Sequence, residues 1–84
     1  AVIGGGIVGL SLAFGLAKAG RSVTILDEGD VAHRASRGNF ALVWVQGKGT
    51  DFPEYARWTL DSALRWPTFA AEIEALTGRP LAYE

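Results

Sequence analysis

The chain has 84 residues, with 8 Lys and Arg against 9 Asp and Glu, a formal net charge of −1, a single His and no Cys. A chain of this length forms at most one small domain, and its near-neutral charge gives no electrostatic basis for binding nucleic acid or an anionic membrane surface. The lack of cysteine excludes disulfides and thiolate metal sites, and one histidine excludes a multi-histidine centre, so we predict no metal site.

The first 26 residues follow the order strand, glycine turn, helix, strand. Residues 1–3 read as the interior of a buried strand, and residues 4–9 form a glycine cluster. Residues 10–19 are rich in helix formers, and Gly20 is expected just past the end of that helix. Residues 23–26 are β-branched and largely apolar, which predicts a parallel strand buried on both faces. The helix would turn one apolar face to the sheet, made of Leu12, Ala13, Leu16 and Ala17.

The middle of the chain, residues 27–50, lacks a clear period and is interrupted by several glycines. Only residues 40–45 could form a strand there. A loop of this length inside a compact domain is usually functional. His33 lies in this loop without a partner at readable spacing, so we expect a surface or hinge histidine and not a general base.

The last third of the chain predicts a helix. Asp51 is the expected N-cap, with Glu54 completing a capping box and Pro53 in the first turn. Pro67 should kink or split the helix, and Gly78 should end it. Its apolar face would pack in a core or a domain interface, and an uncovered face would make an isolated fragment self-associate. That face comprises Tyr55, Trp58, Trp66, Phe69, Ile73 and Leu76.

The glycine cluster fits the pattern G-x-G-x-x-G in the context that gives the pattern meaning, between a strand and a helix. Gly4 would allow the tight turn, Gly6 a close approach of the backbone to a pyrophosphate, and Gly9 close packing of the helix on the sheet. The backbone amides around Ile7 and Val8 would then face the phosphates, with the positive end of the helix dipole behind them. The alternative is a glycine-rich turn between a strand and a helix that binds no ligand.

A carboxylate stands where this fold needs one, at the end of the second strand. Asp27 is placed to accept hydrogen bonds from the ribose hydroxyls of a dinucleotide, and the adjacent Glu28 could share or take over that role. A carboxylate here repels a 2′-phosphate, which disfavours NADP. These residues alone do not separate FAD from NAD.

The next segment, Ala35-Ser36-Arg37-Gly38-Asn39-Phe40-Ala41, carries a resemblance to a known family. With the fingerprint and Asp27, it resembles the N-terminus of the D-amino-acid oxidase-like (DAO) family of FAD-dependent oxidoreductases, over essentially all 84 residues. The family often has Gly where this chain has Ala41. Residues 44–49 are similar to the opine oxidase and hydroxyproline dehydrogenase branch of that family.

The resemblance implies a second set of flavin contacts. Ser36 and Arg37 would reach the pyrophosphate, and five further residues would run along the ribityl chain: Gly38, Asn39, Phe40, Ala41 and Leu42. The residue types support this assignment independently, because Arg offers paired donors for phosphate and Ser and Asn offer short hydrogen-bonding groups. The alternative is a solvated basic loop.

We therefore predict an α/β fold, a Rossmann-like βαβ unit plus a following helix in a larger three-layer domain, with residues 1–84 as the N-terminal portion of an FAD-binding domain and both ends cut. By resemblance, the full enzyme would be cytoplasmic and would use FAD to oxidise the C–N bond of an amino or imino acid. We expect no catalytic residue in this chain and no membrane span. The alternatives are an NAD-dependent dehydrogenase unit and a non-catalytic interaction module.

Overall fold

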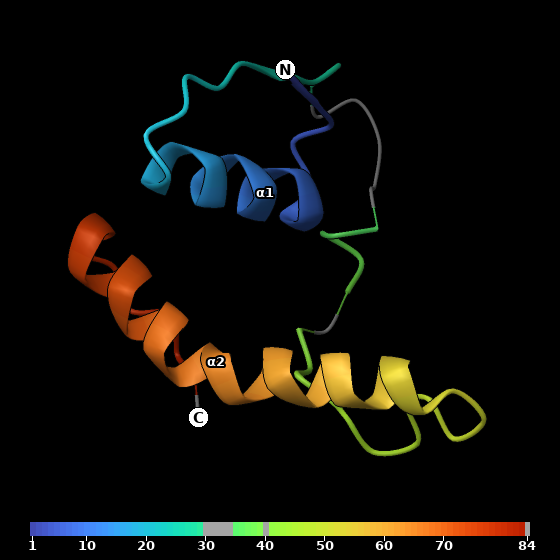
Figure 1. Ribbon diagram of the computed structural model, residues 1–84. Helices are drawn as coiled ribbons and strands as arrows, with labels where there is room; N and C mark the ends of the chain where they lie inside the picture. The colour runs from blue at the N-terminus through green and yellow to red at the C-terminus, as the bar shows by residue number, and fades with distance from the viewer. Residues whose placement is uncertain (30–34, 40, 84) are drawn as a thin grey trace. The chain divides into compact units, whose positions relative to one another are not determined.

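The computed structural model describes residues 1–29, 35–39 and 41–83 (Figure 1). The described elements follow the order β1, α1, β2 and α2. They fall into two compact units, Ala1–Ala41 and Leu42–Glu84. His33 and Phe40 lie outside the described residues.

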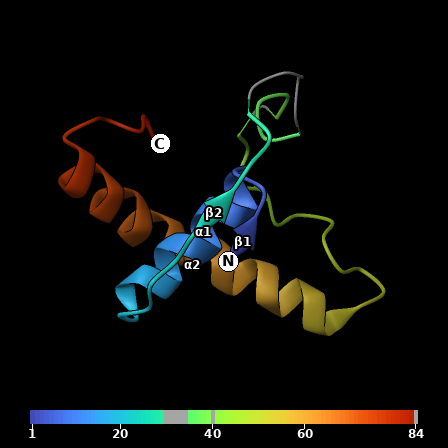
Figure 2. The same cartoon turned by 90° about the horizontal axis from the view of Figure 1, so that it is seen from above.

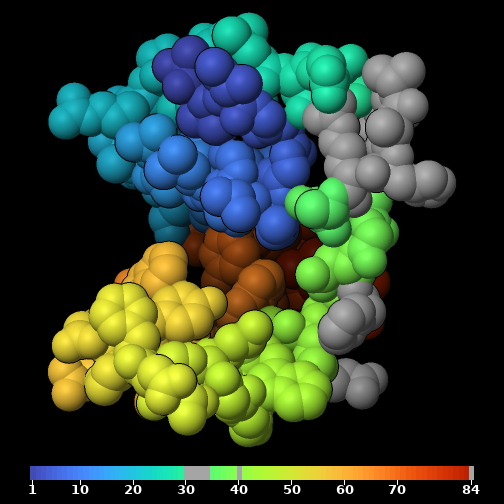
Figure 3. All heavy atoms as spheres, turned by 90° about the vertical axis from the view of Figure 1, so that its right-hand side faces the viewer, coloured from blue at the N-terminus to red at the C-terminus, as the bar shows by residue number. Residues whose placement is uncertain are grey.

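The first unit is a strand–helix–strand piece of α/β type. β1 (Val2–Ile3) and β2 (Ile25–Leu26) pair in parallel, with Val2 opposite Ile25 and Ile3 opposite Leu26. The amide of Val2 donates to the Thr24 carbonyl and the amide of Gly4 to the Leu26 carbonyl, both at 2.8 Å. Both strands contact α1 (Ile7–Lys18), the helix that connects them in sequence, and Figure 2 shows them lying over it. In the space-filling view the dark blue first residues lie between the blue atoms of α1 and the teal atoms around β2 (Figure 3).

The helix α1 begins three residues earlier than the composition predicts, at Ile7 and not at residue 10. Gly9 therefore lies inside the helix, where glycine costs about 1 kcal/mol relative to alanine. The close approach of α1 to the preceding turn outweighs that propensity, because a Cβ on residue 9 would overlap the carbonyl oxygen of Gly4. The C-terminal end follows the prediction, because the amides of Gly20 and Arg21 donate to the carbonyls of Ala17 and Leu16.

The core of the first unit is small and consists of Val2 and Ala13, which are 8% and 7% exposed. The predicted face of α1 is only partly right, because Leu12 is 55% exposed. The prediction that the second strand is buried on both faces is wrong for the described residues: Ile25 and Leu26 are exposed. Apart from each other, the two strands contact only α1 among the described elements, and a sheet this narrow leaves apolar side chains on both of its faces open to solvent.

The second unit is dominated by one helix, α2 (Pro53–Thr77). The predicted N-cap at Asp51 is wrong, because the helix is capped by Phe52 and has no side-chain cap. The reason is Pro53, which takes the first helical position because its missing N–H is not needed there. The helix runs through Pro67 unbroken, and Figure 1 shows its axis change direction in the orange part. Gly78 ends it in the left-handed conformation, with its amide on the Glu74 carbonyl, as predicted.

The aromatic face of α2 is partly packed and partly exposed. Trp66 stacks on Tyr83 of the C-terminal tail and meets Phe69 edge-on, whereas Trp58 is 68% exposed. Ala70 is the buried apolar residue of this unit. Self-association through this face stays a prediction. The strand predicted over 40–45 is wrong for its described part, because residues 41–45 have no regular structure.

Candidate functional site

In the tight glycine turn between β1 and α1, two positions, Gly4 and Gly9, disfavour any residue with a side chain. Gly4 has φ +99°, a conformation that residues with a Cβ rarely adopt. A Cβ on Gly9 would overlap the carbonyl oxygen of Gly4 and lie 3.4 Å from the Val2 side chain. The glycine turn therefore packs the start of α1 against the end of β1, and several backbone amides lie close together there.

Four amides at the start of α1 have no partner inside the helix. The first helical hydrogen bond runs from the Leu10 amide to the Gly6 carbonyl at 2.9 Å, which leaves the amides of residues 6–9 available. The Ile7 amide donates to Ser36 Oγ at 2.9 Å. Within the described part of the chain, the amides of Gly6, Val8 and Gly9 donate to no acceptor. Three donors thus remain at the positive end of the helix dipole, an arrangement that suits an anion.

Asp27 joins this turn to the segment after β2. Its Oδ2 accepts the Gly5 amide at 2.6 Å, and its Oδ1 accepts the Gly29 amide at 2.9 Å. A Cβ on Gly5 would lie only 3.2 Å from the carboxyl group, so the middle glycine leaves room for Asp27. The carboxylate that the spacing singles out therefore lies beside the glycine turn, at the same edge as the bare amides.

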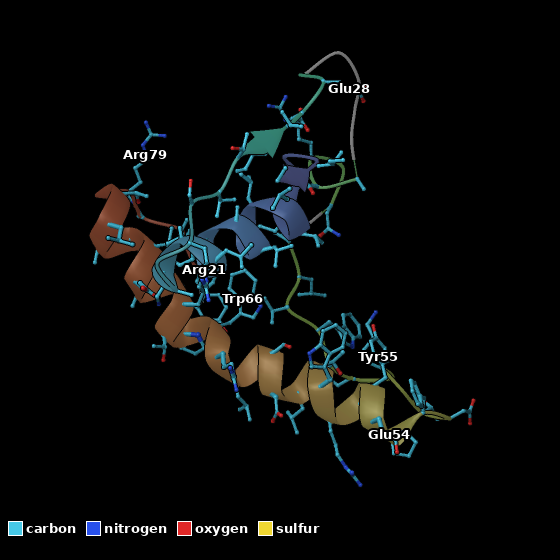
Figure 4. All side chains as sticks on the ribbon, turned by 45° about the horizontal axis from the view of Figure 1, so that its top comes forward. Arg21, Glu28, Glu54, Tyr55, Trp66 and Arg79 are labelled. Carbon is cyan, nitrogen blue, oxygen red and sulfur yellow. The ribbon has the colours of Figure 1, made fainter. Side chains whose placement is uncertain are left out.

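Gly5 and Gly29 contribute to this arrangement, although the sequence pattern did not identify either as a site residue. The signal for Gly29 is the pair Asp27 and Gly29, because an Asp side chain often accepts the backbone amide two residues on. For Gly5, the fingerprint G-x-G-x-x-G allows any residue, so the pattern does not show why this position is glycine. Glu28, the second predicted carboxylate, is exposed on the segment directly after β2 (Figure 4).

The second predicted segment is described over residues 35–39. Ser36 contacts the start of α1 as above, and Arg37 and Gly38 are exposed. Asn39 Oδ1 accepts the amide of Ala41 at 2.7 Å, a local turn that holds Ala41 at φ +56°. Leu42, predicted to continue this run, lies in the second unit and is 52% exposed. The structure therefore brings Asp27 and Ser36 to the glycine turn.

Ala41 adopts a backbone conformation that favours glycine, so we expect Ala41→Gly to stabilise the protein by up to about 1 kcal/mol. The relief of the left-handed strain outweighs the greater entropy of glycine in the unfolded chain. Chemical unfolding measures the change. Ala63→Gly inside α2 is the matched control, where the same replacement should destabilise by about 1 kcal/mol. A loss of stability in Ala41→Gly comparable to that of the control would contradict this prediction.

Comparison with known proteins decides the family. The sequence profile of the DAO family, described as FAD dependent oxidoreductase, matches residues 1–83. The chain belongs to this DAO family. The family resemblance carried by the glycine turn, Asp27 and the segment from Ala35 to Ala41 is thereby confirmed.

The DAO chain is similar to a subunit of opine oxidase from Agrobacterium tumefaciens (strain Ach5), with 59% identity over 69 residues, 82% of this chain and 19% of that protein. It is 49% identical over 77 residues to the corresponding opine oxidase protein of Rhizobium meliloti, covering 92% of this chain and 21% of that protein. D-amino acid dehydrogenase of Helicobacter pylori is 48% identical over 42 residues, 50% of this chain and 10% of that protein. The chain thus spans about a fifth of the two opine oxidase proteins. No solved structure gives a significant match.

The residues of this DAO chain fit the cofactor that the family uses. Among the described residues, the amides of Gly6, Val8 and Gly9 donate to no acceptor, and such amides suit a diphosphate; the Asp27 carboxylate, a group suited to ribose hydroxyls, lies at the same turn. Within residues 1–29, 35–39 and 41–83, no group of three acidic or His side chains could hold a metal ion. None of the described helices is long and apolar enough to cross a membrane.

Proposed function

We propose that residues 1–84 are the N-terminal portion of a larger, three-layer Rossmann-like domain and bind the ADP moiety of FAD. The observation that carries the proposal is the 2.6 Å hydrogen bond from the Gly5 amide to Asp27 Oδ2. This bond fixes a carboxylate for the ribose beside the amides suited to the phosphates, which is the pairing that dinucleotide recognition requires. Membership of the DAO family favours FAD over NAD as the dinucleotide.

Each residue of the turn has a distinct part in this proposal. The amides of Gly6, Val8 and Gly9 donate to the diphosphate, and the helix dipole of α1 adds to the attraction. Asp27 accepts the amides of Gly5 and Gly29, and its carboxylate also accepts hydrogen bonds from the ribose hydroxyls, because each carboxylate oxygen can accept more than one hydrogen bond. Arg37 adds a charged, two-pronged donor for a phosphate oxygen. The carboxylate also repels a 2′-phosphate, so the site discriminates against NADP.

We propose that the full-length enzyme oxidises the C–N bond of a small amino or imino acid, as the names opine oxidase and D-amino acid dehydrogenase of its relatives suggest. The bound flavin supplies the hydride-accepting chemistry. The contribution of this chain is to bind and orient the adenine end of the cofactor. None of its residues is proposed as a catalyst, and the groups that bind the substrate are expected outside residues 1–84.

The full-length protein, purified without added cofactor, is expected to show the visible absorbance of a flavin. Acid release followed by chromatography should identify FAD and not FMN, because the proposed site holds the ADP moiety that FMN lacks. A colourless protein that binds NAD in calorimetry would instead identify a nicotinamide dehydrogenase. A protein that binds neither dinucleotide would favour a non-catalytic interaction module.

A further inference from the structure

We infer that Ser36 is a positioning residue that fastens the second flavin segment to the start of α1, and that Gly6 lacks a side chain to leave room for the Ser36 hydroxyl. The inference rests on the proposed function, because it concerns the same cofactor site. It explains the glycine at position 6 by the Ser36 hydroxyl and not by the close approach of a pyrophosphate. It also makes the second segment part of the site before any cofactor binds.

The contact that carries the inference joins two distant parts of the chain. Ser36 Oγ accepts the Ile7 amide at 2.9 Å, across 29 positions of sequence. The N-cap residue of α1 is Gly6, which has no side chain to cap the helix. Ser36 therefore does from another segment what an N-cap side chain usually does from the helix itself. Its hydroxyl proton stays available for a second partner, because a serine hydroxyl both accepts and donates.

The space around Gly6 supports the second half of the inference. A Cβ built on Gly6 would lie 3.0 Å from Ser36 Oγ but 4.0 Å from Ser36 Cβ. The first distance is tight, so the hydroxyl would have to shift by a few tenths of an ångström, and the second is ordinary van der Waals contact. Gly6 has φ −75° and extended ψ, a conformation that alanine adopts without strain. The obstacle that the chain itself presents to a side chain at residue 6 is therefore the Ser36 hydroxyl.

This contact has a consequence for cofactor binding. A segment that is already held at the helix start loses less conformational freedom when the cofactor arrives, so binding is tighter. Removing the hydroxyl frees the segment, and adding a methyl group at residue 6 pushes the hydroxyl away. Both substitutions act on the same contact, so their effects on cofactor affinity should not add.

The test is a double-mutant cycle on the full-length apoprotein, with FAD affinity measured for wild type, Gly6→Ala, Ser36→Ala and the double variant. We expect Ser36→Ala to weaken FAD binding by about tenfold. The double variant should bind FAD no more weakly than Gly6→Ala alone. Ser36→Thr, which keeps the hydroxyl, should bind within about threefold of wild type. Ser11→Ala, an exposed serine of α1, is the control and should change nothing.

Hydrogen exchange of the apoprotein separates this inference from the cofactor assignment. The peptide containing Ile7 should exchange faster in Ser36→Ala and in Gly6→Ala than in wild type, whether or not the protein binds FAD. Additive losses of FAD affinity would assign Gly6 to the pyrophosphate and overturn the inference. Unchanged exchange at Ile7, or a Ser36→Thr protein as weak as Ser36→Ala, would also overturn it.

Discussion

Replacing Gly9 by alanine is expected to abolish flavin binding by the full-length protein and to destabilise it by about 3 kcal/mol. The added methyl group would overlap the Gly4 carbonyl oxygen. That oxygen cannot rotate away without changing the Gly4 backbone, whose φ of +99° forms the turn. α1 must then move away from β1, and the amides at the start of the helix lose their alignment. Flavin absorbance of the purified variant and its thermal unfolding measure the two effects.

Gly15→Ala is the matched control for this experiment, because it makes the same change in the same helix. A Cβ on Gly15 meets no atom within 4 Å. This variant should keep its flavin and gain about 0.5–1 kcal/mol of stability from the better helix propensity of alanine. A Gly9→Ala protein that retains flavin at the level of Gly15→Ala would refute the tight packing of α1 on the turn.

Asp27→Asn is expected to lower FAD affinity by at least about a hundredfold. In the native chain both carboxylate oxygens accept backbone amides, from Gly5 and from Gly29. An asparagine must place its NH₂ group against one of these N–H groups, so one hydrogen bond becomes a contact between two donors. The substitution also removes the charge that attracts the ribose hydroxyls. Titration of the apoprotein with FAD measures the loss.

Two further carboxylates provide the comparison for Asp27. Glu28→Gln removes the neighbouring charge without touching the Gly5 contact, and we expect a loss below tenfold. Asp61→Asn, on an exposed position of α2 in the second unit, should leave FAD affinity unchanged. A larger loss in Glu28→Gln than in Asp27→Asn would transfer the ribose contact to Glu28.

The glycine run leaves room for two of the protein's own side chains. A Cβ at Gly5 would crowd the Asp27 carboxyl, and a Cβ at Gly6 would crowd the Ser36 hydroxyl. The two side chains each accept an amide of the same turn, at Gly5 and at Ile7. The turn is therefore held from two sides, by the end of β2 and by the second segment.

The features that depend on local chemistry can be predicted from the order of the amino acids. The order strand, glycine turn, helix, strand follows from composition and from the glycine spacing, and the structure has it. The helix ends at Gly20 and Gly78 follow from the C-terminal preference for glycine. The spacing of the fingerprint and Asp27, joined with the family resemblance, was enough to identify the DAO family.

Other features depend on contacts between residues that are distant in sequence, and local patterns do not predict them. Composition placed the start of α1 at residue 10, but packing against Gly4 extends the helix back to Ile7 at the expense of a helical glycine. Apolar content predicted a second strand buried on both faces, but burial depends on what covers a strand, and Ile25 and Leu26 are exposed. The Ser36 contact with Ile7 spans 29 positions, so no local pattern predicts it. Propensity acts within a few residues, whereas burial and long-range hydrogen bonds exist only once the chain has folded.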